Sequence, residues 1–211
     1  MKSHPLEHRH HRRSIRLQGW DYSEARAYFV TICTQNHQCL LGDVVNDEML
    51  LNECGGVVAQ YWEWLRGQYL HLDLDAWIVM PNHVHGIIVI GEACRGGSRT
   101  APTKGKPLGR LVGAFKTVST KQINLMRGTP GAPVWQRNYY EHIIRNEEEC
   151  NLIRKYIADN PLLWALDREN PQVSASARRG GSRTAPTDEV EAILYGSRKA
   201  HDIKPCQDVT A

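Results

Sequence analysis

Residues 80–90 read MPNHVHGIIVI, and this segment constrains the fold more than any other part of the chain. Its last eight residues are almost continuously apolar, which is typical of a strand in the middle of a sheet. His83 and His85 interrupt the run and are separated only by Val84. Because successive side chains of a strand point to opposite faces, the histidines share one face, about 6–7 Å apart along the chain. Two imidazoles directed at one spot suggest a bound metal ion, and a purely structural role for both remains an equal alternative.

The chain has 211 residues, 41% of them hydrophobic, which suffices for one well-filled core with tails. No stretch approaches the roughly 18 apolar residues of a membrane span, and the charged N-terminus lacks the apolar segment of a secretory signal. The six cysteines are scattered without a CxxC pair, so we expect reduced thiols in an intracellular protein. These features predict a cytoplasmic protein without a membrane partner.

The net charge of +3 says little about partners, but the local charge is informative. Residues 8–16 read HRHHRRSIR, and Arg12, Arg13 and Arg16 in this basic arm are candidates for contacts with phosphates. A solvated terminus without a binding role is equally compatible with this composition.

Hydrophobic periodicity and end signals predict a mixture of strands and helices. The predicted strands span residues 27–36, 38–44 (the hairpin partner of the first), 72–80, 83–90 and 132–145. The predicted helices span residues 50–69, 108–126 and 146–161, with Asn52 and Asn146 as N-caps and Pro161 as the stop of the last helix. Because the order lacks the regular alternation of a wound parallel sheet, we predict an α+β fold. We expect a ferredoxin-like or RRM-like sandwich, with an antiparallel sheet and the helices packed on one face. The histidine pair should lie on a central strand of the sheet.

The composition divides the chain into three parts. We expect a basic N-terminal arm over residues 1–20, one domain over 21–166 with a flexible loop insertion at 91–107, and a poorly ordered tail over 167–211. The nonapeptide RGGSRTAPT occurs at 95–103 and again at 179–187. Both copies lie in loop-like segments and are too short and too far apart for a solenoid, so we interpret them as tolerated insertions.

A second candidate group lies on the last predicted helix. Tyr156 and Asn160 are four residues apart and therefore share a helix face. The tyrosine offers a phenolic nucleophile, and the asparagine offers a neutral oxygen ligand. Tyr139 and Tyr140 are alternative nucleophiles, of which one can face the site, and His142 is an alternative ligand. A core aromatic role for Tyr156 also stays open.

Three segments together resemble a known family: MPNHVHGIIVI, WQRNYYEHIIRNEEE and YIADNP. They look like a single-tyrosine HUH transposase, named after its histidine–hydrophobic–histidine motif. More closely, the chain resembles the REP-associated tyrosine transposases, which are related to the single-stranded-DNA insertion-sequence transposases. The segment RRSIRLQGWDYSEARAYFVTICTQN is also similar to that group, so the resemblance covers about residues 12–165.

The resemblance implies a metal-dependent DNA transposase and endonuclease. His83 and His85 would bind a divalent ion, Mg²⁺ or Mn²⁺, with Asn160 where the insertion-sequence relatives carry a glutamine ligand. Tyr156 would attack DNA and form a 5′-phosphotyrosine, so that single-stranded DNA is cleaved and rejoined without a nucleotide cofactor. The implied partners are hairpins of the repetitive extragenic palindrome type, and the expected location is the cytoplasm, in association with the nucleoid. A monomer is slightly favoured over a homodimer, because the sequence has no obvious exposed apolar stripe.

DNA binding requires further residues for phosphates and unpaired bases. The candidates are Arg12, Arg13, Arg16, Lys104, Lys106, Arg110, Lys116, Lys121, Trp135, Gln136 and Arg137. One alternative is a non-catalytic hairpin DNA- or RNA-binding protein on the same fold. A metal-dependent hydrolase of small phosphoesters is a third reading, but no clustered acidic residues accompany the histidines.

Overall fold

The computed structural model describes residues 25–91, 106–167 and 169–171. The predicted N-terminal arm, both RGGSRTAPT copies and most of the predicted tail lie outside these residues. So do four of the candidates for DNA contacts, Arg12, Arg13, Arg16 and Lys104. Within the described ranges, no helix has the length and apolar character needed to span a membrane.

Four strands form one fully antiparallel sheet in the order β4-β5-β1-β6. They are β1 (Arg26–Cys33), β4 (Leu72–Met80), β5 (His83–Ile90) and β6 (Tyr140–Ile143). The helices are α1 (Glu53–Gln68), α2 (Leu108–Arg127) and α3 (Glu147–Leu163). The chain order β1-α1-β4-β5-α2-β6 is that of the ferredoxin-like split βαβ fold, which confirms the predicted α+β class. β5 lies between β4 and β1 and is therefore a central strand.

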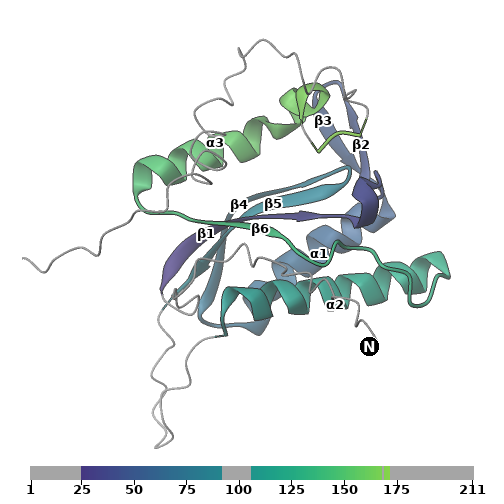
Figure 1. Cartoon of the computed structure of the whole chain (residues 1–211), viewed down its shortest axis with the longest axis horizontal. Helices are drawn as coiled ribbons and strands as arrows, with labels where there is room; N and C mark the ends of the chain where they lie inside the picture. The colour runs from purple at the N-terminus through teal and green to yellow at the C-terminus, as the bar shows by residue number, and fades with distance from the viewer. Residues whose placement is uncertain (1–24, 92–105, 168, 172–211) are drawn as a thin grey trace, which may run out of the picture.

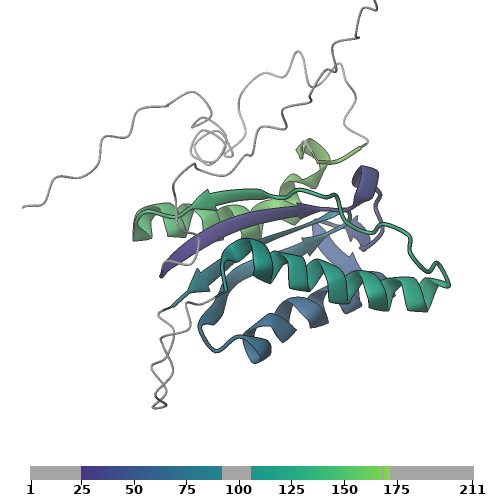
Figure 2. The ribbon, with the colours of Figure 1, turned by 60° about the horizontal axis from the view of Figure 1, so that its bottom comes forward.

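The helices cover both faces of the sheet, and not one face as predicted. Figures 1 and 2 both place α1 and α2 on one side of the sheet and α3 on the other. Val84 and Ile88 of β5 lie in the core shared with α1 and α2, whereas Ile87 lies in a second core with Ile153 and Ile157 of α3. A strand that is apolar on both faces needs cover on both, so the third helix packs opposite the other two.

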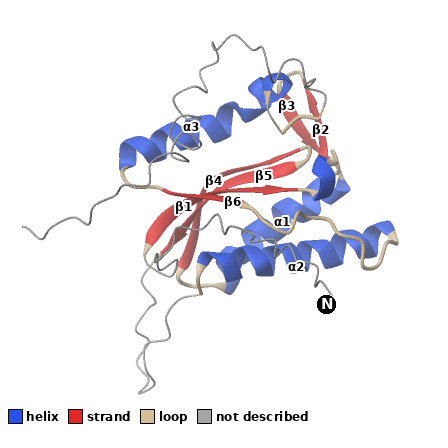
Figure 3. Ribbon diagram, viewed as in Figure 1, coloured by secondary structure: helices blue, strands red, loops and turns tan. Residues whose placement is uncertain are grey.

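The segment after β1 also differs from the prediction. β2 (Gly42–Val45) pairs with β3 (Glu48–Leu51) as a separate hairpin and not with β1, as Figure 3 shows beside the main sheet. Both edges of β1 are already occupied by β5 and β6. In the short helix η1 (Gln35–His37), Asn36 and His37 have φ angles of 56° and 54°, which turn the chain away from the sheet.

Helix α3 begins where the sequence predicts and ends later. The side chain of Asn146 accepts a hydrogen bond from the Glu149 N–H at 2.8 Å, as expected of an N-cap. Pro161 was predicted to stop the helix, but α3 continues to Leu163 and passes into the helix η2 (Trp164–Leu166). The fixed φ of proline is itself helical, so a last turn can follow it. This extra turn determines where Asp167 lies.

The close approach of β5 to α1 requires a glycine. A Cβ at Gly86 would lie 2.4 Å from a ring carbon of Trp62, which is fully buried and packs edge-on against Phe115 at 5.2 Å. The ring has no space to withdraw, so Gly86→Ala is expected to lower the free energy of unfolding by about 1–3 kcal/mol. Urea unfolding measures this. The matched control, Gly56→Ala in α1, meets nothing within 4 Å and should stabilise by about 0.5–1 kcal/mol. Equal effects of the two variants would contradict this packing.

Candidate functional site

His83 and His85 open strand β5 and point toward α3. Their ring centroids are 4.4 Å apart, and their exposed fractions are 0% and 1%. Across the sheet they are paired with Cys33 and Thr31 of β1. The alternation of the strand therefore places both imidazoles on one face, as the spacing predicts.

Asn82 fixes the tautomer of His83. The Asn82 side chain donates from Nδ2 to the carbonyls of His37 and Glu169, at 3.2 and 2.6 Å, which orients the amide. Its Oδ1 therefore faces His83 Nδ1 at 2.9 Å and accepts the hydrogen of that nitrogen. His83 Nε2 is left with a lone pair directed into the site, the arrangement that metal-binding histidines adopt.

His85 has a hydroxyl group beside each of its ring nitrogens. Its Nδ1 lies 2.9 Å from the Thr31 hydroxyl, and its Nε2 lies 3.3 Å from the hydroxyl of Tyr156. Burial lowers the pKa of His83 to about 4 and lowers the pKa of His85 well below its usual value. Both imidazoles are therefore neutral at pH 7, which is the form that binds metal ions.

Several potential ligand atoms converge on His83. The carboxylate of Asp167 lies 4.0 Å from His83 Nε2, and its side chain is 6% exposed. Among the described residues, neither His83 Nε2 nor the buried Asn160 Oδ1 has a hydrogen-bond partner. Ligand atoms of His83, His85 and Asp167 all lie within 4.8 Å of one another. A divalent metal suits this set of two nitrogens and two side-chain oxygens, and it would satisfy the two atoms that lack a partner, His83 Nε2 and Asn160 Oδ1.

The structure separates the candidate tyrosines and places His142 elsewhere. Tyr140 lies on the α3 side of the sheet with Phe29, at 6.4 Å between ring centroids, whereas Tyr139 packs in the core on the other side. Tyr156, on α3, has its ring 5.2 Å from that of His85. His142 is paired with Glu149 at 2.8 Å, and Glu149 also accepts from the Arg145 N–H. His142 therefore contributes to the start of α3 and not to the group around His83.

Sequence reasoning missed three residues around the histidines: Thr31, Asn82 and Asp167. Asn82 directly precedes the histidine pair, and an asparagine in that position is the available signal for an orienting residue. Asp167 carries no such signal, because it falls at the start of the predicted tail. Residues 169–171 of that tail are described, and Asn170 is 5% exposed with its side chain bonded to the Trp164 carbonyl.

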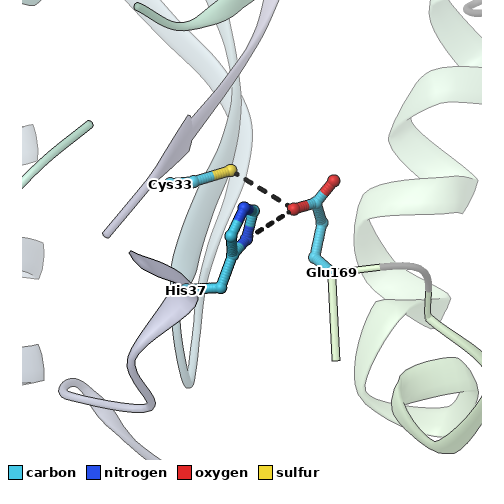
Figure 4. A group of neighbouring side chains, drawn as sticks. All are labelled: Cys33, His37 and Glu169. Carbon is cyan, nitrogen blue, oxygen red and sulfur yellow. Dashed lines mark hydrogen bonds and ion pairs between the residues drawn. The ribbon is translucent and has the colours of Figure 1, made fainter. Parts of the chain in front are cut away.

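A second polar cluster adjoins the histidines and is drawn in Figure 4. Glu169 Oε2 lies 2.9 Å from His37 Nδ1 and accepts from the Cys33 thiol at 3.6 Å. Burial, followed by the negative charge of Glu169, raises the pKa of the Cys33 thiol far above its usual value. The cluster attaches the segment after η2 to the end of β1.

Five of the candidates for DNA contacts line one groove of about 790 Å³ beside the C-terminal half of α2: Lys116, Lys121, Trp135, Gln136 and Arg137. Two of them have structural roles. Lys116 donates to the carbonyls of Gln136 and Asn138, and burial lowers its pKa to about 8. Trp135 is 6% exposed and donates to Ser119. Lys121 and Arg137 are exposed, while Lys106 and Arg110 lie at the other end of α2, outside the groove.

The chain matches no family model. Among solved structures it is similar to a REP-associated tyrosine transposase bound to a REP hairpin, with a TM-score of 0.43 and 17% identity, covering 89% of this chain and 94% of that one. It is also similar to a candidate transposase from Deinococcus radiodurans, with a TM-score of 0.36 and 18% identity, covering 68% and 95%. An uncharacterized protein of Haemophilus influenzae is 40% identical over an alignment of 169 residues that covers 75% of this chain and 93% of that protein. The chain therefore belongs to the same family as this Haemophilus influenzae protein.

Proposed function

We propose that the protein is a transposase of the tyrosine HUH class, a metal-dependent nuclease and strand transferase for single-stranded DNA. One observation carries the proposal. The Tyr156 hydroxyl lies 3.3 Å from His85 Nε2, at the edge of a buried set of metal-binding atoms. A phenol poised beside a cation site has the two parts that phosphodiester exchange through a tyrosine requires.

His83, His85, Asn160 and Asp167 would hold the ion. When bound, a divalent ion supplies Lewis-acid polarisation of a phosphate oxygen. The donor set mixes imidazole nitrogen with amide and carboxylate oxygen, and imidazole suits Mn²⁺ better than Mg²⁺. We expect Mn²⁺ to support activity at least as well as Mg²⁺.

Tyr156 would act as the nucleophile. Its oxygen forms a bond to the scissile phosphorus while the bond from phosphorus to the 3′ oxygen breaks, leaving a 5′-phosphotyrosine and a free 3′-OH. The phenolic proton leaves Tyr156, and the departing 3′ oxygen gains a proton. A phenol has a pKa near 10 and is a tolerable leaving group, so a 3′-OH can reverse the step and join strands without a nucleotide cofactor.

The placement of Tyr156 on a helix supports this role. The N-cap at Asn146 fixes where α3 begins, and Ile153 and Ile157 anchor the helix in the core against β5. Tyr156 lies between these two anchors, and Phe29 contacts its ring edge-on at 6.1 Å. A nucleophile held on a packed element keeps its geometry better than one on a loop.

The groove beside α2 is the proposed contact surface for the DNA hairpin. Its exposed cations, Lys121 and Arg137, are available to phosphates, and Gln136 is half-buried with its side chain against His37. Lys116 and Trp135 hold the segment that carries Gln136 and Arg137, so their contribution to binding is indirect.

Replacing Lys121 or Arg137 by Ala is expected to weaken binding of hairpin oligonucleotides. Each variant should reduce the slope of log K against log salt by about one, because each removes one phosphate contact. Fluorescence anisotropy at several salt concentrations measures the slope. Arg66→Ala is the matched control, since Arg66 already pairs with Asp73 and Glu63 on another surface. An unchanged slope in both groove variants would exclude this surface.

The proposed function is tested with single-stranded hairpin oligonucleotides from the flanks of the protein's own gene. With Mn²⁺, the purified protein should form a denaturant-resistant adduct with the labelled strand, and EDTA should prevent it. An oligonucleotide of the same composition without a hairpin should react less. Tight hairpin binding without any adduct would refute the nuclease and favour the non-catalytic binding protein.

A further inference from the structure

Cys33, His37 and Glu169 come from three separate segments and meet at the end of β1. Cys33 is the last residue of β1, His37 ends η1, and Glu169 follows η2. One ligand atom from each lies within 4.8 Å of the other two, and Figure 4 shows all three side chains directed at a common point. The His37 backbone is held at a φ of 54°, a conformation that non-glycine residues rarely adopt and that occurs preferentially at functional sites.

The chemical types of these atoms define what they can bind. A thiol sulfur, an imidazole nitrogen and a carboxylate oxygen are together the ligand types of Zn²⁺, whereas Mg²⁺ prefers oxygen alone. Tetrahedral zinc sites place neighbouring ligand atoms about 3.3–3.6 Å apart. The distance from Cys33 Sγ to Glu169 Oε2 is 3.6 Å, and that from His37 Nδ1 to the same oxygen is 2.9 Å. The ion would fit after a small increase in the distance between His37 Nδ1 and Glu169 Oε2.

We propose that Cys33, His37 and Glu169 form a zinc-binding site next to the histidine pair but separate from it. The cluster borders on solvent, because the side chains of His37 and Glu169 are 42% and 22% exposed, while His37 Nδ1 itself is buried. Three protein ligands leave the fourth position to water.

Neighbouring residues orient two of the three ligands from outside. Gln136 holds the His37 ring from outside, because its side-chain Nε2 donates to His37 Nε2 at 2.8 Å. The ring hydrogen is then on Nδ1 and points at Glu169, so zinc would replace that hydrogen while the Gln136 amide turns to present its oxygen to Nε2. Asn82 donates to the carbonyls of both His37 and Glu169 and so holds the two backbones side by side. Such outer contacts are typical of metal sites in proteins.

The proposed zinc would stabilise the segment that carries Asp167. The Glu169 N–H donates to Asp167 Oδ1 at 2.7 Å, and the other carboxylate oxygen of Asp167 lies 4.0 Å from His83. An ion bound to Glu169 would therefore keep this segment attached to the end of the sheet, next to His83.

Cobalt(II) substitution tests the site directly, because a thiolate ligand gives Co²⁺ an intense near-ultraviolet charge-transfer absorption. The full-length protein, stripped of metals and reduced, should develop this absorption with two equivalents of Co²⁺, enough for both proposed sites, and lose it when Zn²⁺ is added. The Cys33→Ser variant should lose the absorption and bind Zn²⁺ at least about 100-fold more weakly. Gln136→Ala, which removes only the contact to His37, should weaken binding by about 10–100-fold and keep the absorption.

Cys39→Ser is the matched control, since Cys39 is exposed and lies outside the cluster. The Cys39→Ser variant with Co²⁺ should show the same charge-transfer absorption as the wild type. Absence of the absorption in the wild type, or its persistence in Cys33→Ser, would overturn the proposal. His37→Gln provides a second variant should Cys33→Ser not fold, with the same expected loss of zinc affinity. The assay contains no DNA, so its outcome does not depend on the proposed nuclease.

Discussion

The Tyr156→Phe variant is expected to form no covalent adduct with DNA under conditions in which the wild type does. The substitution removes only the phenolic oxygen, which is the proposed nucleophile, and keeps the ring contacts with Phe29 and His85. The lost hydrogen bond to His85 should cost about 0.5–1.5 kcal/mol of folding free energy, so the variant should stay folded. Hairpin binding should be unchanged, because the groove beside α2 is untouched. A denaturing gel and an anisotropy titration measure the two properties separately.

Tyr140→Phe is the control for this variant. Tyr140 lies on the same face of the sheet as the histidines and contacts Phe29, as Tyr156 does. The Tyr140→Phe variant should form the adduct at the wild-type rate. An adduct that persists in Tyr156→Phe and vanishes in Tyr140→Phe would show that Tyr140, and not Tyr156, is the nucleophile.

The His83→Ala variant is expected to bind Mn²⁺ at least about 100-fold more weakly than the wild type and to form no adduct. The variant removes the lone pair at the centre of the proposed ligand set and leaves Asn82 Oδ1 without its donor. The unpaired Asn82 oxygen should cost about 1–3 kcal/mol of stability, which thermal unfolding measures. Electron paramagnetic resonance of free Mn²⁺ measures the affinity without reference to activity.

His71→Ala is the control for the metal-binding measurement. His71 precedes Leu72, which pairs with Ile90 at the end of the sheet opposite His83, so Mn²⁺ binding should not change. Asp167→Asn then separates the two possible oxygen ligands, because it keeps the shape of the side chain and removes its charge. A loss of about 10–100-fold in that variant would include Asp167 in the site. Wild-type affinity in His83→Ala would contradict the proposed metal site as a whole.

The grouping of His83, His85, Tyr156 and Asn160 could be predicted from residue spacing within one strand and within one helix. The period of two on β5 puts both imidazoles on one face, and the period of 3.6 on α3 puts the tyrosine and asparagine on one face. That the two faces meet follows from the apolar residues between them, Ile87 on the strand and Ile157 on the helix. The resemblance to the HUH transposases indicates the same four residues.

The other parts of the site depend on contacts between distant segments and left no local signal. Asp167 reaches His83 only because α3 continues past Pro161, and the sequence favours a stop there. The role of Asn82 depends on the carbonyls of His37 and Glu169, which orient its side chain and come from distant segments. Lys116 and Trp135 are of residue types that commonly contact DNA. In the structure both are at least partly buried, and they donate hydrogen bonds to the Gln136 carbonyl and the Ser119 hydroxyl.

The measurement that tests the central claim most directly is mass spectrometry of the adduct. The protein is reacted with a hairpin oligonucleotide and Mn²⁺, digested with nuclease and protease, and searched for a peptide that carries a nucleotide. The proposed function predicts a single modified peptide, with the 5′ phosphate attached to the oxygen of Tyr156. A phosphate on Tyr139 or Tyr140, or no modified peptide while the strand is still cut, would contradict it.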